Sequence, residues 1–133
     1  MADWLIKIVA DGDGCSAFVP SQPGAGPGSA LKAFEDDTVT FNNTTGEAHW
    51  PWPTDETFTP WADDKVSKDL GTYLSGEIPP HRPSDVIFNV PEITPPPPAK
   101  PSPFGPKIYY YCKLHHNEHG SIEVQKVPPK TTS

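Results

Sequence analysis

The chain has 133 residues, which is long enough for one domain with its own hydrophobic core and too short for two. Ten basic against 17 acidic residues give a net charge of −7, and no cluster of Lys or Arg occurs, which argues against a nucleic-acid-binding protein. No run of about 18 apolar residues is present, so the sequence predicts no membrane-spanning helix.

The predicted elements are mostly strands. The 19 prolines, far above the usual share of about 5%, disfavour long helices, because a proline ring clashes inside a helix and lacks an amide donor. Stretches rich in β-branched and aromatic residues predict strands, and in chain order these are residues 5–10, 16–19, 38–42, 85–90, 107–112 and 121–127. Short strands separated by turn-forming residues are typical of an all-β sandwich or barrel.

The segments between the strands are predicted from their composition. Residues 12–14 and 20–29 are rich in glycine and proline and predict loops. Residues 62–74 are the one stretch with helical spacing, so we expect a short helix within an inserted loop. Residues 91–106 contain four consecutive prolines and predict an extended polyproline connection. We expect a single domain over the whole chain, with residues 128–133 as a flexible tail.

The strongest chemical signal is the segment YYYCKLHHNEHGSIEV in the C-terminal third. Cys112 ends a predicted strand and His115 follows three residues later, so a tight loop can bring a thiolate and an imidazole onto one ion. This pairing of donors suits copper or zinc. The other cysteine, Cys15, lies in a glycine-rich turn, and a Cys15–Cys112 disulfide is the alternative that would remove the thiolate.

A second segment with a possible ligand lies far upstream, in VTFNNTTGEAHWPWP. Here a predicted strand ends in two asparagines, a turn follows, and His49 precedes Trp50. Alone this signal is weak, because most single histidines are surface or capping residues. Trp50 and Trp52 either shield a metal edge or dock a partner, or serve as ordinary core residues.

Together the two segments resemble the cupredoxin family of blue, type 1 copper proteins. The resemblance rests on VTF-N-N…H at residues 39–49 and on YxC-x2-H…G-x-I-x-V at residues 110–124. It implies a Greek-key β-sandwich with one copper ion near one end. It also implies that His49, Cys112 and His115 are the ligands of an electron-transfer site.

The sequence departs from the family at the axial ligand. Family members usually place methionine two residues before the glycine of G-x-I-x-V, and here that position is Glu118. His119 is the competing axial donor and His116 a more distant one; a water or a carbonyl is the option if none of them binds. A carboxylate or imidazole is a harder donor than a thioether, so we expect a lower reduction potential and a colour shifted from blue toward green, brown or red. A class of red copper proteins with a glutamate ligand is a partial analogue.

The ligand set favours a soluble one-electron carrier with no catalysis of its own. Two alternatives stay open: a mononuclear copper enzyme with an open coordination position, and a copper storage or delivery protein that uses the cluster of histidines. The acidic surface suits transient docking of a monomer to redox partner proteins. We expect a periplasmic or extracellular location, although residues 4–10 are too short and lack the basic start of a signal peptide.

Overall fold

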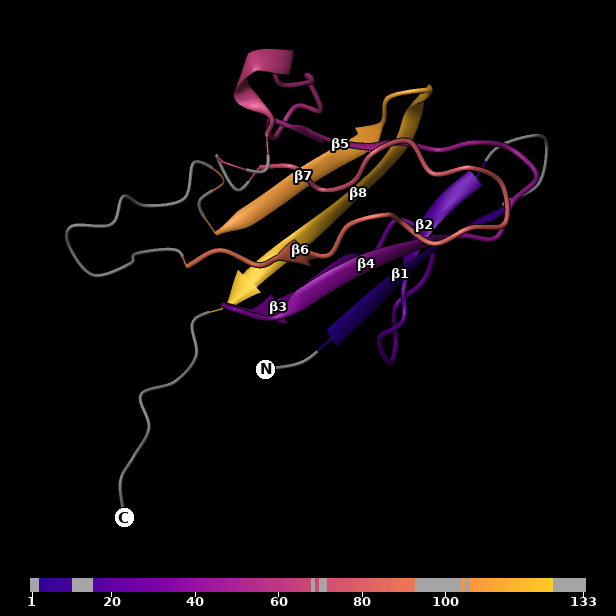
Figure 1. The fold of residues 1–133 in the computed structure, drawn as a ribbon. Helices are drawn as coiled ribbons and strands as arrows, with labels where there is room; N and C mark the ends of the chain where they lie inside the picture. The colour runs from indigo at the N-terminus through magenta and orange to yellow at the C-terminus, as the bar shows by residue number, and fades with distance from the viewer. Residues whose placement is uncertain are drawn as a thin grey trace.

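The computed structural model describes residues 3–10, 16–67, 69, 72–92, 104 and 106–125. The strands form two four-stranded sheets packed face to face (Figure 1). The first sheet has the order β2-β1-β4-β6, with β1 at Asp3–Ala10, β2 at Ser16–Pro20, β4 at Thr38–Asn43 and β6 at Phe88–Asn89. The second has the order β3-β8-β7-β5, with β3 at Ala30–Phe34, β5 at Pro51–Thr54, β7 at Lys107–Cys112 and β8 at His115–Gln125.

Both sheets mix parallel and antiparallel pairs. In the first, β1 runs antiparallel to β2 and parallel to β4, with Ile6 opposite Phe41. In the second, β7 runs antiparallel to both β5 and β8, whereas β3 runs parallel to β8. The turn between β7 and β8 lies at one end of the sandwich, and the arrowhead of β8 lies at the other (Figure 1).

Alternation along the strands decides which side chains enter the space between the sheets. In β4 the buried positions are Val39, Phe41 and Asn43, so the inward stripe begins apolar and ends on a polar residue. In β7 the inward positions Ile108, Tyr110 and Cys112 follow the same rule, although Tyr111 beside them is buried too. The last inward residue of each strand is therefore polar or reactive: Asn43 in β4 and Cys112 in β7.

Tyr110 occupies the middle of this core. Its ring makes edge-on contacts with the rings of Phe18 and Phe41, at centroid distances of 4.9 and 5.5 Å. Gly120 is the cross-strand partner of Tyr110, and a Cβ atom at position 120 would overlap the tyrosine ring. A glycine is therefore required at this position, because the aromatic ring fills the space that a side chain would need.

The prediction of an all-β sandwich is confirmed, but several predicted bounds change. Two strands were not predicted, β3 and β5. Prolines in β5 are tolerated because it is the last strand in its sheet, where a missing amide breaks no ladder on the outer side. The predicted strand 85–90 contains only the two residues of β6, and β8 begins at His115, six residues earlier than expected.

The predicted helix over residues 62–74 is wrong. Among the residues described there, the backbone forms only a 3-10 turn at Asp63–Lys65. Val66 already has extended dihedral angles, and Thr72 closes a loop onto Ser67, whose amide donates to the threonine hydroxyl. Apolar side chains at helical spacing were therefore misleading, because side-chain hydrogen bonds hold the backbone in a loop.

Some predictions fall on residues that the structure does not describe. These are the loop at residues 12–14, Cys15, most of the proline-rich segment 91–106, the last two residues of the predicted strand 121–127, and the tail 128–133. Within the described part of the chain, no helix is long and apolar enough to cross a membrane.

Candidate metal centre

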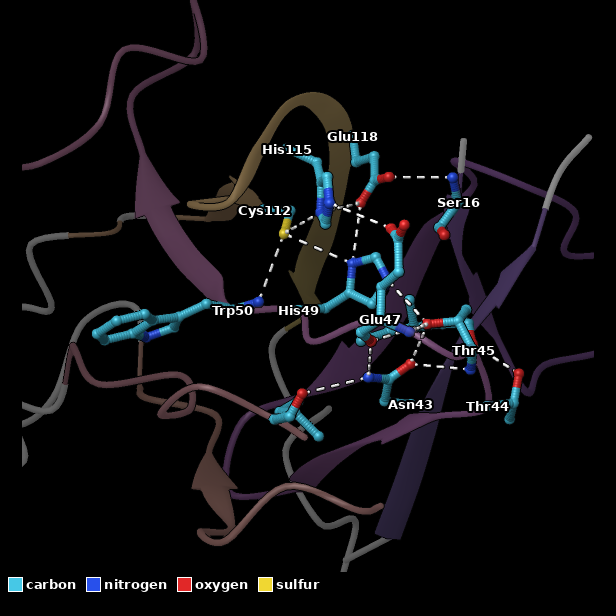
Figure 2. Close-up of polar contacts among 12 residues, drawn as sticks. Ser16, Asn43, Thr44, Thr45, Glu47, His49, Trp50, Cys112, His115 and Glu118 are labelled. Atoms are coloured by element: carbon cyan, nitrogen blue, oxygen red, sulfur yellow. Dashed lines mark hydrogen bonds and ion pairs between the residues drawn. The ribbon is translucent and has the colours of Figure 1, made fainter. Parts of the chain in front are cut away.

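Four side chains meet at the end of the sandwich that carries the β7–β8 turn. They come from His49, Cys112, His115 and Glu118, and one potential ligand atom from each lies within 4.8 Å of all the others (Figure 2). The Cys112 Sγ atom lies 3.6 Å from His49 Nδ1 and 3.4 Å from His115 Nδ1. The Glu118 Oε1 atom lies 3.1 Å from His49 Nδ1 and 3.6 Å from His115 Nδ1.

Three of these side chains come from one hairpin. Cys112 ends the inward stripe of β7, and His115 opens β8 directly opposite it, so two turn residues separate a sulfur from an imidazole. The register shifts between Tyr111 and Cys112, as in a β-bulge. Further along β8, Glu118 is buried and points inward, with the same parity as Gly120. The hairpin thus supplies a thiolate, an imidazole and a carboxylate to one point.

Strand parity also places the competing axial residue. His119 follows Glu118 on β8 and is exposed, on the opposite face. Its ring stacks on Phe58 at a centroid distance of 4.1 Å and an interplanar angle of 14°. The structure therefore brings Glu118 into the cluster and leaves His119 outside it. Nothing is described of the His116 side chain.

His49 reaches the cluster from the other segment of the chain. Its backbone makes a two-way bridge with Ile78, in which His49 N–H donates at 3.0 Å and Ile78 N–H donates back at 2.7 Å. The ring is fully buried. Because both the main chain and the ring are fixed, Nδ1 is held toward the cysteine and the glutamate.

A polar network at the end of β4 determines which nitrogen of His49 faces the cluster. Asn43 Oδ1 accepts hydrogen bonds from the amide and the hydroxyl of Thr45, at 2.9 and 2.7 Å. The Thr45 hydroxyl oxygen in turn lies 2.9 Å from His49 Nε2. With the hydroxyl hydrogen directed at Asn43, the threonine oxygen accepts from Nε2–H. Neutral His49 therefore carries its hydrogen on Nε2 and presents the lone pair of Nδ1 to the cluster.

The Glu118 carboxylate is held from the opposite sheet. The backbone N–H of Ser16, the first residue of β2, donates to Oε2 at 3.0 Å (Figure 2). The second oxygen, Oε1, is buried and makes no hydrogen bond in the described part of the chain, and the atoms that face it are the Nδ1 atoms of His49 and His115. A buried carboxylate oxygen without a donor is costly unless a cation faces it.

Electrostatics within the cluster favour an ionised sulfur. Burial alone would raise the pKa of the Cys112 thiol, but hydrogen bonds from His49, from the amide of Trp50 and from His115 outweigh it and lower the pKa. The Trp50 amide lies 3.4 Å from Sγ. Burial would likewise lower the pKa of His49, yet contacts with Cys112 and Glu118 raise that pKa to about 9. These contacts favour a positive charge at the point where the sulfur, the carboxylate and the imidazole of His49 meet, and a bound metal ion would supply such a charge.

The distances fit a single ion. Donors placed about 2.0–2.3 Å from one ion in a near-tetrahedral arrangement lie about 3.5 Å from one another. The four separations given above between sulfur, imidazole and carboxylate atoms run from 3.1 to 3.6 Å. The buried Oε1 atom of Glu118 adds a carboxylate donor at the same point. The donor set of one thiolate, two imidazoles and one carboxylate suits a borderline transition metal such as copper or zinc.

The surroundings of the cluster include two tryptophans that the sequence singled out. Trp52 is buried and its indole N–H donates to the Trp61 carbonyl, so it acts as a core residue. Trp50 donates its indole N–H to the Ser75 carbonyl. The ammonium of Lys113 lies 3.8 Å above the Trp52 ring, between the hairpin turn and the tryptophans. The two rings therefore contact the side chain of Lys113, the hairpin-turn residue that follows Cys112.

Comparison with known proteins agrees with the fold described above. No protein-family model and no curated protein matches the chain. Among solved structures, a novel purple cupredoxin from Nitrosopumilus maritimus is similar over 91% of this chain and 98% of its own, with a TM-score of 0.59 and 17% identity. The chain has the cupredoxin fold. Two amicyanin variants in the Cu(I) form cover 91% of this chain and 80% of their own, with TM-scores of 0.49 and 0.48 and identities of 16% and 15%.

At 17% identity the similarity to the purple cupredoxin establishes the fold alone, and the chemistry of the site depends on the residues of this chain. Cys112 is a free cysteine, so the disulfide alternative does not apply to it. Sequence reasoning did not find Thr45, Glu47 or the Ser16 amide, which contact His49, His115 and Glu118, respectively. Thr45 and Glu47 lie between Asn43 and His49 in the first motif, and this position is the sequence feature that could have indicated their contacts with the cluster.

Proposed function

We propose that this protein binds one copper ion through His49, Cys112 and His115, with Glu118 as the fourth, axial ligand, and carries single electrons. The observation that supports this best is the convergence of one sulfur, two imidazole Nδ1 atoms and a buried carboxylate oxygen within 4.8 Å on a cupredoxin fold. A bound copper ion supplies a one-electron couple at this point.

The residues around the cluster favour electron transfer over metal delivery. His49 and Cys112 are fully buried, and Glu118 is nearly so. The surrounding scaffold also holds each of them by a hydrogen bond: His49 donates to the Thr45 hydroxyl oxygen, Cys112 accepts from the Trp50 amide and Glu118 accepts from the Ser16 amide. A site with fixed and buried donors changes little between oxidation states and exchanges its metal slowly, whereas delivery needs exposed, exchangeable donors.

Glu118 sets the expected redox properties. A carboxylate is a harder donor than the thioether that methionine provides, and it adds a negative charge to a buried site. Both effects favour Cu(II) over Cu(I). We therefore infer a reduction potential below that of methionine-bearing cupredoxins and a colour displaced from blue, as in the red copper proteins that the sequence resembles in part.

We infer the route of electrons into the site from the exposed fractions of the clustered side chains. The side chain of His115 is 30% exposed, while the other three clustered side chains are buried. The net charge of −7 favours a basic redox partner that docks briefly and comes near this imidazole. We infer a periplasmic or extracellular location, which suits such a carrier.

The test is to add Cu(II) to the purified protein and record its visible and electron paramagnetic resonance spectra. We expect an intense thiolate-to-copper charge-transfer band that ascorbate bleaches reversibly and that Cys112→Ser abolishes. Copper binding without that band would overturn the ligand assignment. A spectrum altered by azide would instead indicate an open, catalytic position, and rapid loss of copper to a mild chelator would indicate a delivery protein.

A further inference from the structure

Glu47 contacts the one clustered imidazole that reaches the surface. Its Oε2 atom lies 3.3 Å from Nε2 of His115, on the side of the ring away from Cys112 (Figure 2). We propose that Glu47 is a positioning residue, which accepts a hydrogen bond from Nε2–H of His115 and thereby holds Nδ1 toward the metal and tunes its donor strength. The inference rests on the copper function proposed above and deepens it.

The main chain of Glu47 is held in place by the network that also holds His49. Its carbonyl oxygen accepts a hydrogen bond from Asn43 Nδ2 at 2.6 Å and lies 3.0 Å from the Thr45 hydroxyl oxygen. Its N–H donates to the Thr45 hydroxyl oxygen at 3.3 Å. A long side chain on a fixed backbone position loses less entropy on docking than one on a mobile loop. The turn over residues 43–47 therefore reaches the outer nitrogens of both histidines, one through a hydroxyl and one through a carboxylate.

The two contacts have the same geometric effect but differ in charge. In each ring the outer nitrogen, Nε2, is paired, so Nδ1 is the atom left for the cluster. Thr45 offers a neutral oxygen to buried His49, whereas Glu47 offers an anion to half-exposed His115. An anionic acceptor draws the Nε2 hydrogen and increases the electron density on Nδ1, which favours the more highly charged metal ion.

An exposed glutamate paired with a histidine normally contributes little to stability, since solvent screens the pair. The Glu47 side chain is 62% exposed, so its value lies in orienting His115 rather than in holding the fold together. Removing it should leave folding intact and change the properties of the metal site. This separation between stability and redox properties makes the proposal testable.

The experiment compares Glu47→Ala and Glu47→Gln with Glu123→Gln as a matched control. Glu123 lies eight residues beyond His115 on β8 and pairs with Lys107 at 3.8 Å, so its replacement removes one surface charge far from the cluster. The reduction potential is measured by voltammetry. Loss of an outer hydrogen-bond partner typically lowers metal affinity by about 10–100-fold. We expect about a tenfold loss of preference for Cu(II) over Cu(I) in Glu47→Ala, which raises the potential by about 59 mV relative to the control.

A second readout does not depend on redox activity. In the diamagnetic Cu(I) protein, nitrogen-resolved NMR should show the Nε2 hydrogen of His115 exchanging slowly with water in the native protein and rapidly in Glu47→Ala. Glu47→Gln should give an intermediate result, because its amide oxygen still accepts a hydrogen bond without the charge. A potential and an exchange rate equal to those of the control would overturn the role of Glu47. Failure of the native protein to show a thiolate-to-copper band would instead overturn the proposed function itself.

Discussion

The Nε2 atom of His49 lies 2.9 Å from the hydroxyl oxygen of Thr45, four residues earlier in the chain. Through this contact, and through Asn43 behind it, the last inward residue of β4 determines how a buried imidazole is oriented. The inward residues of β4 before Asn43 are core residues, and Asn43 at its end helps to orient a candidate metal ligand.

Thr45→Val tests this arrangement. The change keeps the shape of the side chain but removes the acceptor for Nε2–H, so His49 loses its fixed tautomer. We expect metal affinity to fall by about 10–100-fold, measured by competition with a chelator. Thr44→Val is the matched control, because the hydroxyl of Thr44 donates to the Ile8 carbonyl and contacts neither histidine. Equal affinities in the two variants would contradict the role of Thr45.

Glu118→Met and His119→Met test the axial position. Glu118 is buried with Oε1 facing His49, whereas His119 is exposed and stacks on Phe58. A thioether at position 118 replaces a hard anionic donor, so we expect a higher potential and an absorption spectrum closer to blue. His119→Met should leave both unchanged. Spectral change from the substitution at position 119, with none at 118, would reverse the assignment.

Tyr110→Phe should stabilise the fold. The hydroxyl is buried and has no hydrogen-bond partner among the described residues, which costs about 1–3 kcal/mol. We therefore expect the free energy of unfolding to rise by about 1 kcal/mol or more, measured by urea titration. Tyr109→Phe, at a half-buried position on the same strand, is the control.

Tyr110→Phe should also change how the free energy of unfolding depends on pH. Burial raises the pKa of Tyr110, so the folded protein keeps the phenol protonated while the unfolded chain loses that proton above about pH 10. The unfolded state then binds fewer protons, and stability should fall by about 1.4 kcal/mol per pH unit above that point. Below it the contribution is fully present. Tyr110→Phe should lack this part of the alkaline loss, and identical slopes in both proteins would contradict it.

Gly120→Ala should destabilise the protein. The added methyl group would overlap the ring of Tyr110, which Phe18 and Phe41 hold from other sides. Overpacking of this kind typically costs about 1–3 kcal/mol. Gly26→Ala is the control, since a Cβ atom there meets nothing within 4 Å. Adding Tyr110→Leu to the Gly120→Ala variant should recover part of the loss in denaturant unfolding.

How far the sequence predicted this structure can be judged from β8. Its apolar alternation predicted a strand from residue 121, because Ile122 and Val124 stand out and the preceding residues are polar. The strand in fact begins at His115. Extending the alternation back from Ile122 puts Glu118 on the inner face and His119 on the outer one. Residues 115–120 of β8 lack the apolar alternation that predicts a strand, because at this end of the sandwich the inward positions hold the polar cluster instead of an apolar core.

Other features could not be predicted because they depend on contacts between distant segments. The bridge between His49 and Ile78, and the hydrogen bond from the Ser16 amide to Glu118, join residues 29 and 102 positions apart in the chain. No local pattern marks either contact. The short strand β5 was missed for a different reason, since its two prolines disfavour a strand except at the edge of a sheet.

The Ser16–Glu118 hydrogen bond also connects the two layers of the sandwich, because Ser16 begins a strand of one sheet and Glu118 lies on the other. If the carboxylate ligates the metal, any change in the spacing of the layers must move a ligand. Core substitutions, hydrostatic pressure or docking of a partner would then each alter the colour of the loaded protein. The chromophore would report mechanical strain in the scaffold without an added label.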